Sequence, residues 1–415
     1  MVTEPRRVVI TGLGAVTPIG NGKDAVWQGV LEGRRGVRGI TRFDPSPFSS
    51  RIAAEVADFD PLDYFDAKRA RRLDRFSRFG LAASRMAAAD ARLDMEREDR
   101  ERVGVYIGSA LGGIDYAEEQ HTNFIEAGIR HVSPMLALGV FGGASAANVS
   151  MDLGAYGPNL GNANSCAAGA IAVGDAFRAI KGGEIDVAVA GGVEAPLAPL
   201  TFGAFAVIKV MSTRNDEPAA ASRPFDRDRD GFVMGEGAGV LVLEDLGHAV
   251  RRDAPIYAEV KGYGLTSDAY HMTAPRPDGR QAARAIRLAL AEAGLPPEGI
   301  DYVAAHASAT TLNDTIETLA IKEALGEHAY RIPVSGTKGM HGHSFGASGA
   351  IELVITALAL RHSVLPATVN LFEPDPACDL SYVRDQPMEQ RVSHVLKNSF
   401  GFGGVNACLV LARVE

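Results

Sequence analysis

The two halves of this 415-residue chain resemble one another, and this internal similarity constrains the fold more than any single motif. NSCAAGAIAVGDAFRAI, which begins at residue 164, resembles HSFGASGAIELVITALAL, which begins at residue 343. The first half ends in GEGAGVLVLED and the second in GFGGVNACLVLARVE, while IYAEVKGYGLTSD at residue 256 resembles the opening RRVVITGLGAVTP. Such similarity indicates two copies of one structural unit. We expect the copies to span residues 1–255 and 256–415.

Short apolar segments alternate with alanine-rich helical segments along the chain. RVVITGLG, VGVYIGSA, DVAVAGGVE and GVLVLED have the composition of buried strands. This alternation favours mixed or parallel sheets covered by helices, so the predicted fold class is α/β. The first copy also contains residues 38–75 and 110–150, for which the second has no counterpart. Insertions of this kind usually build substrate cover or subunit contacts.

The charge balance argues against nucleic acid and membranes as partners. Lys and Arg number 42 and Asp and Glu 51, which gives a net charge of −9. An acidic partner would therefore need a local basic patch. The opening MVTEPRRVVITGLG places two arginines before an apolar strand, but glycines and polar residues interrupt it too early for a signal peptide or a membrane span. We expect a cytoplasmic protein.

Three cysteines lie far apart without CxxC spacing, so neither a disulfide framework nor a zinc site is expected. Cys378, in PDPACDL, and Cys408, in ACLVLARV, are interpreted as small buried apolar residues. The third is Cys166. It lies between an Asn/Ser-rich turn and a run of small residues, which predicts a helix N-terminus with Asn164 or Ser165 as its cap.

A helix N-terminus gives Cys166 a route to reactivity. The partial positive charge of the helix end stabilises a thiolate, which is the nucleophilic form of cysteine. The small residues at 167–169 would also let a thioester approach closely. On this segment alone, a reactive nucleophile and a buried structural cysteine remain equal alternatives.

Two other patterns could suggest a cofactor. Gly12 and Gly14 follow the first strand, but Thr17 stands where a dinucleotide fingerprint needs its third glycine, so we expect a tight turn there. His341 and His343 have i, i+2 spacing, but no third metal ligand lies at a characteristic distance in the sequence. We therefore expect neither a nucleotide nor a metal.

YVAAHASATTLNDTIETLA places His306 directly after an apolar strand, where loops commonly form sites. A core histidine is the alternative. Ser308 and Thr310 add hydroxyl groups behind it. Asp314 and Glu317 have i, i+3 spacing on a predicted helix, at which two carboxylates can share a cation.

The last two segments lie in the second half. VSGTKGMHGHSFGASGAIE supplies Lys338 and His343 ahead of the counterpart of the Cys166 helix, and His343 is interpreted as a hydrogen-bond donor. NSFGFGG places glycines around Phe400 and Phe402. Glycine-rich turns let backbone N–H groups point into a site, as an oxyanion hole requires. A tight turn before the last strand is the alternative.

Taken together, these segments resemble the thiolase-fold condensing enzymes, and among them the β-ketoacyl-ACP synthases and type II polyketide ketosynthases. The resemblance covers nearly the whole chain and includes MSTRNDEPAAASRPFDRDRDGFVMGEGAGVLVLED, SDAYHMTAP and TKGMHGHSFGASGA. So long an ordered series is far more specific than one motif. It implies a thiolase-like fold, layered αβαβα with two pseudo-duplicated halves, and a homodimer.

The resemblance also implies a decarboxylative condensation. Cys166 would receive the acyl chain from acyl carrier protein as a thioester, and His306 and His343 would hydrogen-bond the malonyl thioester as it loses CO2. The backbone N–H groups of Cys166 and Phe402 would hold the oxyanion. No cofactor is implied, because phosphopantetheine arrives on the carrier protein.

Supporting roles follow from the same resemblance. Phe402 would gate the acyl pocket, with Phe400 among the substrate-binding residues. Ser308 and Thr310 would hydrogen-bond pantetheine. The members of a buried charged network that orders the histidines would be Lys338, Asp314 and Glu317.

A basic stretch marks the expected docking site of the carrier protein. FDAKRARRLDRF has Lys68, Arg71 and Arg72 where relatives dock this acidic partner. A solvated helix face is the alternative. Ser165, Ala168, residues 307–309 and His341 differ from the usual residues of the family, which leaves the acyl preference open.

Three other functions within the fold can be compared with fatty-acid elongation. FDPSPFSSRIAAEV and LGEHAYRIPVS resemble type II polyketide ketosynthases, whereas NSFGFGG is more similar to the fatty-acid branch. A chain-length-factor-like partner is disfavoured because those relatives lack the nucleophile. A degradative thiolase normally carries a second catalytic cysteine near its C-terminus, and here Cys408 lies in a strand-like segment. We expect an acyltransferase of fatty-acid biosynthesis.

Overall fold

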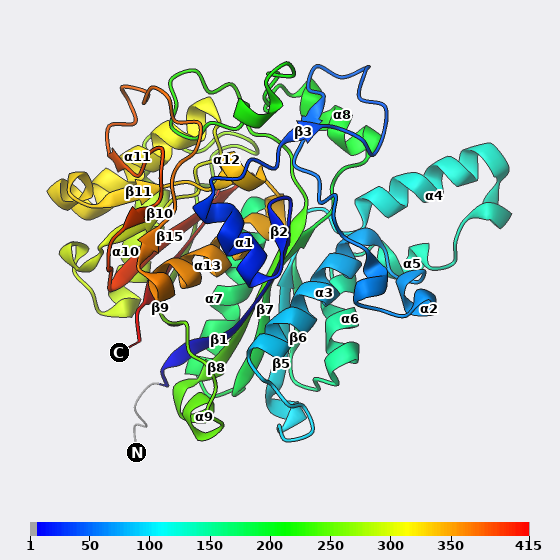
Figure 1. Ribbon diagram of the computed structural model, residues 1–415, viewed down its shortest axis with the longest axis horizontal. Coiled ribbons are helices and arrows are strands. Elements are labelled where there is room, and N and C mark those ends of the chain that lie inside the picture. Colours follow the sequence, from blue (N-terminus) through cyan, green and yellow to red (C-terminus); the bar gives the residue numbers. More distant parts are fainter. Residues whose placement is uncertain (1–5, 415) are drawn as a thin grey trace.

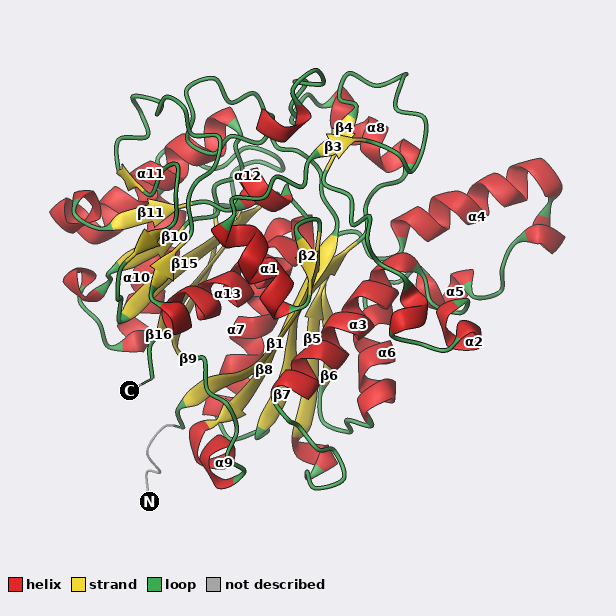
Figure 2. Cartoon of the chain, viewed as in Figure 1, coloured by secondary structure: helices red, strands yellow, loops and turns green. Residues whose placement is uncertain are grey.

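The computed structural model describes residues 6–414, most of whose strands form one large twisted sheet flanked by helices (Figures 1 and 2). Strands of the first half are β1 (Val8–Thr17), β5 (Val103–Gly108), β6 (Asn159–Asn162), β7 (Val187–Glu194) and β8 (Gly237–Asp245). Those of the second half are β9 (Ala258–Ser267), β10 (Tyr302–Ala304), β11 (Pro333–Ser335), β13 (Ser381–Tyr382), β15 (His394–Gly401) and β16 (Val405–Ala412).

The strand order repeats outward from the centre of the sheet. Strands β1 and β9 pair antiparallel in the middle, and the full order is β13-β11-β10-β15-β16-β9-β1-β8-β7-β5-β6. On one side β1, β8 and β7 pair antiparallel and β7, β5 and β6 parallel. On the other side β9, β16 and β15 pair antiparallel and β15, β10 and β11 parallel. The two halves therefore have one topology, as the internal similarity predicts.

Helices complete the predicted αβαβα layering. In the middle layer, α7 (Ala168–Lys181) and α13 (Phe345–His362) pack against each other. The outer layers are α3 (Arg75–Asp90) with α6 (Ala144–Leu153) on the first half and α10 (Arg280–Ala293) with α11 (Thr311–Leu325) on the second. Every residue of α13 from 345 to 360 is buried, as expected of a helix between two sheet faces.

Successive side chains along the central strands point alternately toward the middle and the outer helical layers. On β8, Leu241 and Leu243 face the cluster that contains α7 and α13, while Val240 and Val242 face α3. Successive strand residues point to opposite faces, so a continuously apolar strand is what a sheet covered on both sides requires.

Gly12 and Gly14 lie inside β1, so the predicted tight turn is wrong. A Cβ atom on Gly12 or Gly14 would lie 2.1 or 2.0 Å from a backbone oxygen of α3. Gly262 and Gly264 of β9 have the same relation to α10, at 2.1 and 2.0 Å. In both halves, the two glycines let an outer helix lie directly on the strand.

The two insertions of the first half lie on one side of the molecule. Residues 38–75 form β3 (Arg38–Gly39), β4 (Ile52–Ala53) and α2 (Ala67–Ala70), and residues 110–150 form α4 (Ile114–Ala127), α5 (Leu136–Gly139) and the start of α6. Helix α4 extends from the body as an arm (Figure 1).

The remaining short elements connect these layers. They are β2 (Gly20–Asn21), α1 (Lys23–Leu31), α8 (Pro199–Val207), α9 (Leu246–Arg251), α12 (Lys338–His341), β12 (Val364–Leu365) and β14 (Met388–Glu389). Residue 255 lies in the loop between α9 and β9, and the division of the chain there stays a prediction. Within residues 6–414, no helix has both the length and the apolar character that crossing a membrane demands.

Candidate active site

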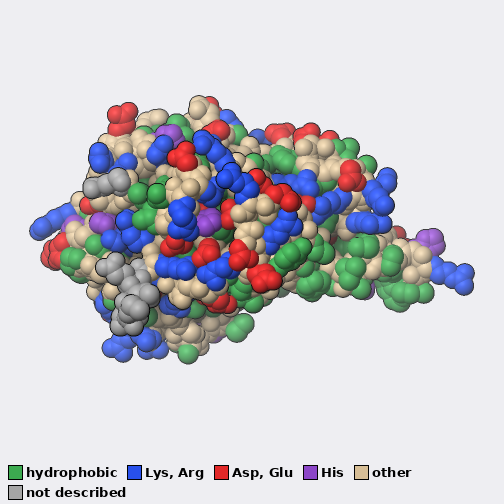
Figure 3. All heavy atoms as spheres, turned by 90° about the horizontal axis from the view of Figure 1, so that it is seen from below, with side chains coloured by type: hydrophobic (Ala, Val, Ile, Leu, Met, Phe, Trp, Pro, Cys, Tyr) green, Lys and Arg blue, Asp and Glu red, His purple; other side chains and the backbone are tan. Residues whose placement is uncertain are grey.

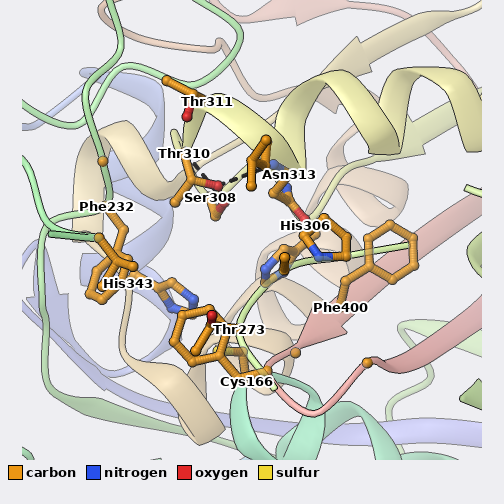
Figure 4. A pocket seen from close by; sticks show the side chains of 18 of the residues that line it. Cys166, Phe232, Thr273, His306, Ser308, Thr310, Thr311, Asn313, His343 and Phe400 are labelled. Carbon is orange, nitrogen blue, oxygen red and sulfur yellow. Dashed lines mark hydrogen bonds between the residues drawn. The ribbon is translucent and has the colours of Figure 1, made fainter. Parts of the chain in front are cut away.

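Four segments that are distant in the sequence meet around one cavity of about 200 Å³. Cys166 comes from the turn before α7, His306 from the loop after β10, and His343 from the turn before α13. The end of β15 supplies Phe400, and the turn between β15 and β16 supplies Phe402. Figure 4 shows the cysteine and both imidazoles facing the same space.

Cys166 lies in a 3₁₀ turn, Ser165–Ala167, and its side chain is almost fully buried. Neither Asn164 nor Ser165 caps the helix with its side chain, so the predicted cap is wrong. Ser165 has a left-handed backbone, with φ of 51°, and its hydroxyl lies 3.7 Å from the Cys166 sulfur. The hydroxyl therefore contacts the thiol rather than the first N–H groups of α7.

Burial raises the pKa of the Cys166 thiol, and the nearby Glu194 carboxylate acts in the same direction. The Ser165 hydroxyl, the Phe402 backbone N–H and the charge of Lys338 act against this shift. The net effect is upward, because desolvation disfavours the charged thiolate more than these groups favour it. Cys166 rests as a thiol, and the Phe402 N–H already points at its sulfur.

The contacts of His343 determine where its proton lies. Its Nδ1 accepts a hydrogen bond from the Phe345 backbone N–H at 3.2 Å and lies 3.0 Å from the Ser348 hydroxyl. Burial and the charge of Lys338 hold the pKa of this imidazole well below its ordinary value. A neutral ring with an accepting Nδ1 carries its proton on Nε2. His343 can therefore donate a hydrogen bond from Nε2, and the donor role expected from the sequence stays a prediction.

His306 has a matching arrangement. Its Nδ1 lies 3.4 Å from the Lys338 ammonium nitrogen, a group that can only donate. Burial and the Lys338 charge again hold the pKa of the imidazole well below its ordinary value. The two ring centroids lie 5.4 Å apart with planes at 78°. Both rings are neutral, and each has an Nε2–H group to offer.

Lys338 has a different carboxylate partner from the one expected. Its ammonium donates to the His306 carbonyl and to Glu352, whose other oxygen lies 2.8 Å from the Lys397 ammonium. Burial alone would raise the pKa of Glu352, but the two lysines hold it below its usual value. Lys338, Glu352 and Lys397 therefore form a buried charged network, which contacts His306 through Lys338.

Asp314 and Glu317 do not share a cation, so that prediction is wrong. Glu317 accepts hydrogen bonds from the backbone N–H groups of His306 and Ala307 at 2.7 and 2.8 Å. Asp314 lies 3.8 Å from Arg229 and accepts from backbone groups of neighbouring loops. Both carboxylates therefore hold the loop after β10, Glu317 through His306 and Ala307 and Asp314 through Ala309, and Asp314 also binds the Phe225 N–H.

Sequence analysis missed Glu352 and Lys397, although both carry a recognisable signal. Glu352 is the one charged residue between Phe345 and Leu360, and Lys397 interrupts the apolar strand β15. A lone charge in a buried run needs an opposite charge nearby. His341, by contrast, is buried against the Thr337 hydroxyl at 3.0 Å and has partners separate from those of His343.

The other predicted site residues line the same cavity. The hydroxyls of Ser308 and Thr310 are 2.9 Å apart, and Thr310 also caps α11 (Figure 4). The ring of Phe400 lies 6.0 Å from that of His306. Phe402 stacks on Phe205 at 6.5 Å. Cys166 belongs to an apolar cluster that includes Phe202, Met211, Phe232, Met234 and Phe345.

The basic stretch lies apart from this cavity. Lys68, Arg71 and Arg72 are exposed on α2 and in the turn after it, and none of them lines the cavity. None forms an ion pair with another residue between 6 and 414. The structure thus leaves these three cations accessible but does not bring them to the cavity of their own chain.

A solved structure shares this fold. The chain matches a ketosynthase described as "AntDE:AntF (apo): type II PKS acyl-carrier protein in complex with its ketosynthase bound to the hexaketide" with a TM-score of 0.91 and 35% identity. The match covers 99% of this chain and 100% of that one. With a buried cysteine and two hydrogen-bond-donating histidines, the fold defines the class of thiolase-like condensing enzymes.

Sequence comparison identifies the family. Residues 5–249 match the family "Beta-ketoacyl synthase, N-terminal domain", and residues 257–372 match "Beta-ketoacyl synthase, C-terminal domain". The chain is 48% identical to the 3-oxoacyl-[acyl-carrier-protein] synthase 2 of Synechocystis sp. and 45% identical to that of Coxiella burnetii, with 99% of each chain covered. This chain belongs to the β-ketoacyl synthase family and is an acyltransferase.

Proposed function

We propose that this chain catalyses the reaction of β-ketoacyl-ACP synthase II, in which malonyl-ACP condenses with an enzyme-bound acyl chain during fatty-acid elongation. The observation that carries the proposal is the convergence of Cys166, His306 and His343 on one cavity beside the Phe402 N–H. The full-length likeness to 3-oxoacyl-ACP synthases supports it.

In the first step, the Cys166 sulfur attacks the thioester carbonyl of acyl-ACP and the pantetheine thiol leaves with the cysteine proton. The N–H groups of Cys166 and Phe402 hold the oxyanion of the tetrahedral intermediate. The apolar cluster around Cys166 suits the acyl tail. Ser308 and Thr310 hydrogen-bond the pantetheine arm, and the Phe402 ring gates the pocket.

In the second step, malonyl-ACP enters beside the two histidines. Their Nε2–H groups hydrogen-bond the thioester carbonyl while the bond to the carboxylate breaks, releasing CO2 and leaving an enolate. The enolate carbon attacks the acyl carbonyl and Cys166 leaves as a thiolate, which regains a proton. The product is 3-oxoacyl-ACP. No resident cofactor is needed, because phosphopantetheine arrives on the carrier protein.

Intact-mass spectrometry after mixing with acyl-ACP tests the nucleophile. The wild type should gain one acyl group and Cys166→Ala none, while Cys378→Ala, which removes a buried thiol outside the cavity, should react normally. Addition of malonyl-ACP should then give 3-oxoacyl-ACP. Absence of an adduct would favour a chain-length-factor-like role, and turnover of poly-β-ketone substrates alone would favour a polyketide ketosynthase.

We further propose that acyl carrier protein docks on Lys68, Arg71 and Arg72. The partner chain of the solved ketosynthase named above is an acyl carrier protein, which supports this kind of partner. Reversal of the three charges to Glu should raise KM for acyl-ACP about tenfold, and more at low salt, without slowing transfer from a small acyl thioester. Arg284→Glu, at an exposed site on α10, is the control. If the charge-reversal variant has the same KM for acyl-ACP as the wild type, this docking site is refuted.

A homodimer is the assembly we propose. Strand β6 is an exposed edge of the large sheet, and Leu160 on it is exposed. Figure 3 shows a hydrophobic area toward the arm. The adjoining insertion and α6 carry these exposed apolar side chains: Phe124, Ile125, Ile129, Leu138, Val140, Phe141 and Met151. A second copy would cover this surface and pair the two edge strands.

Light scattering tests this assembly. The wild type should have twice the mass of one chain, and Leu160→Asp should dissociate it, whereas Leu288→Asp on the exposed face of α10 should not. A monomeric wild type would refute the proposal. The cytoplasmic location expected from the sequence stays a prediction.

A further inference from the structure

Glu194, the last residue of β7, is a fully buried carboxylate that the reaction described above does not use. Its Oε1 accepts hydrogen bonds from the Ser109 hydroxyl and the Leu111 N–H, both at 3.0 Å. Its Oε2 accepts from the N–H groups of Ala110 and Gly346 at 2.7 and 2.9 Å. Across residues 6–414, no Lys, Arg or His forms an ion pair with it. Backbone and hydroxyl dipoles alone hold this charge.

The duplicated fold shows what Glu194 replaces. Strands β7 and β15 hold equivalent places in the sheet and end at Glu194 and Gly401. Alignment of the shared Gly-Ala-Ile of the two central helices places Gly346 opposite Cys166. A Cβ atom on Gly401 would lie 3.1 Å from the Cys166 nitrogen, and Glu194 binds the Gly346 nitrogen. Glu194 therefore fills, in the second half, the position that the oxyanion would take in the first.

The turn that Glu194 holds through Gly346 also contacts His343. The preceding residue, Phe345, has a strained backbone with φ of 37°, and its N–H donates to His343 Nδ1. The rings of Phe345 and His343 are stacked at 5.3 Å. Such a conformation persists only where the surroundings hold it. Glu194 holds the next residue of this turn and connects it to residues 109–112.

We propose that Glu194 is a positioning residue for the malonyl half of the reaction: its carboxylate fixes the turn at Phe345 and Gly346 and so sets the direction of the His343 Nε2–H. The inference rests on the proposed function. It predicts that loss of the carboxylate slows decarboxylative condensation more than transfer of the acyl chain to Cys166.

Only an ionised carboxylate can accept from all of these donors. An amide or a protonated acid has one fewer acceptor and turns a hydrogen toward N–H groups. Burial raises the pKa of Glu194 to about 7, while its four hydrogen bonds act in the opposite direction. The titratable group that senses its charge is the Cys166 thiol, and His343 stays neutral well below this pH. The malonyl step should therefore change with pH near 7.

Glu194→Gln tests the proposal in single-turnover experiments. Cys166 acylation by acyl-ACP should change less than about threefold, whereas condensation of pre-acylated enzyme with malonyl-ACP should slow about tenfold or more, since a misplaced donor weakens transition-state stabilisation. The wild-type pH profile of condensation should bend near pH 7, and the variant profile should lack this bend. Glu244→Gln removes a buried carboxylate that does not line the cavity and should leave the ratio of the two rates unchanged.

Ser109→Ala provides a second variant if Glu194→Gln fails to fold. It removes one donor to the carboxylate, so the bend should move to higher pH. Equal slowing of both steps in folded Glu194→Gln, or an unmoved bend in Ser109→Ala, would overturn the proposal. A wild type that never acylates Cys166 would instead refute the proposed function itself.

Discussion

The turns before α7 and α13 have equivalent places in the two halves, but their backbone N–H groups have different partners. When the shared Gly-Ala-Ile is aligned, Ser165 and Phe345 are equivalent, and both have left-handed backbones, with φ of 51° and 37°. The next N–H belongs to Cys166 in one turn and to Gly346 in the other. That of Gly346 donates to Glu194, whereas that of Cys166 has no acceptor between residues 6 and 414.

This difference shows how one copy of a duplicated unit can acquire a site that binds negative charge. A helix N-terminus attracts negative charge through its unpaired N–H groups. In the second half, the Glu194 carboxylate accepts a hydrogen bond from one such group, the Gly346 N–H. The first half has Gly401 where the carboxylate would be, so an N–H stays available for charge that develops on a substrate.

A side chain at Gly401, beside the turn before α7, should have the largest effect on the rate of reaction. Gly401→Ala would place a methyl group 3.1 Å from the Cys166 nitrogen and 3.3 Å from that of Ala167, where the oxyanion is expected. Gly401 is not among the glycines with positive φ, so the backbone should tolerate alanine. Single-turnover acylation of Cys166 should slow about 100- to 1000-fold. Gly39→Ala, which meets no neighbour, is the control, and acylation of Gly401→Ala at the wild-type rate would break the comparison.

A side chain at Gly346, in the turn before α13, should reduce the stability of the protein. A Cβ atom on Gly346 would lie 2.6 Å from the Ala110 nitrogen and 2.8 Å from the Glu194 Oε2. Because backbone must move, Gly346→Ala should lower the free energy of unfolding by about 1–3 kcal/mol. Urea denaturation measures this, with Gly142→Ala, which meets nothing within 4 Å, as the control. Unchanged stability would show that the second turn is looser than the first.

The Glu194 carboxylate, which binds the turn before α13, should make the free energy of unfolding depend on pH. Burial raises the pKa of Glu194 to about 7, above its unfolded value, so the folded state binds more protons between about pH 4.5 and 7. Stability from this group is therefore greatest at low pH and falls as pH rises through that window. The free energy of unfolding of the wild type, relative to Glu194→Gln, should fall by about 2 kcal/mol from pH 5 to 8. A constant difference would contradict the shift.

The smallest effect should come from the residue before the nucleophile. The Ser165 hydroxyl lowers the pKa of the Cys166 thiol and is 3.7 Å from its sulfur. Ser165→Ala keeps the backbone but removes this contact, so the thiolate fraction should fall. Alkylation of Cys166 by iodoacetamide at pH 8 should slow about two- to threefold. Faster alkylation would mean that the hydroxyl shields the sulfur instead.

Local sequence patterns determined much of the architecture. The alternation of strands and helices predicted the α/β class, and the internal similarity predicted two copies, because each copy carries its own apolar periodicity. The strand before His306 and the helices after Cys166 and His343 follow from the same periodicity. Cys378 and Cys408 are buried, as their apolar surroundings indicated. The roles of the site residues came from the family resemblance rather than from these patterns.

Only the tertiary structure decided which groups meet. The partner of Lys338 is Glu352 rather than Asp314 or Glu317, because α13 rather than α11 faces the ammonium group. Gly12 and Gly14 admit a helix instead of forming a turn, and burial raises the pKa of the Cys166 thiol. The function of Glu194 depends on residues 109–112 and 346 lying together. Electrostatic and packing energies depend on distances across the fold, which local sequence patterns do not contain.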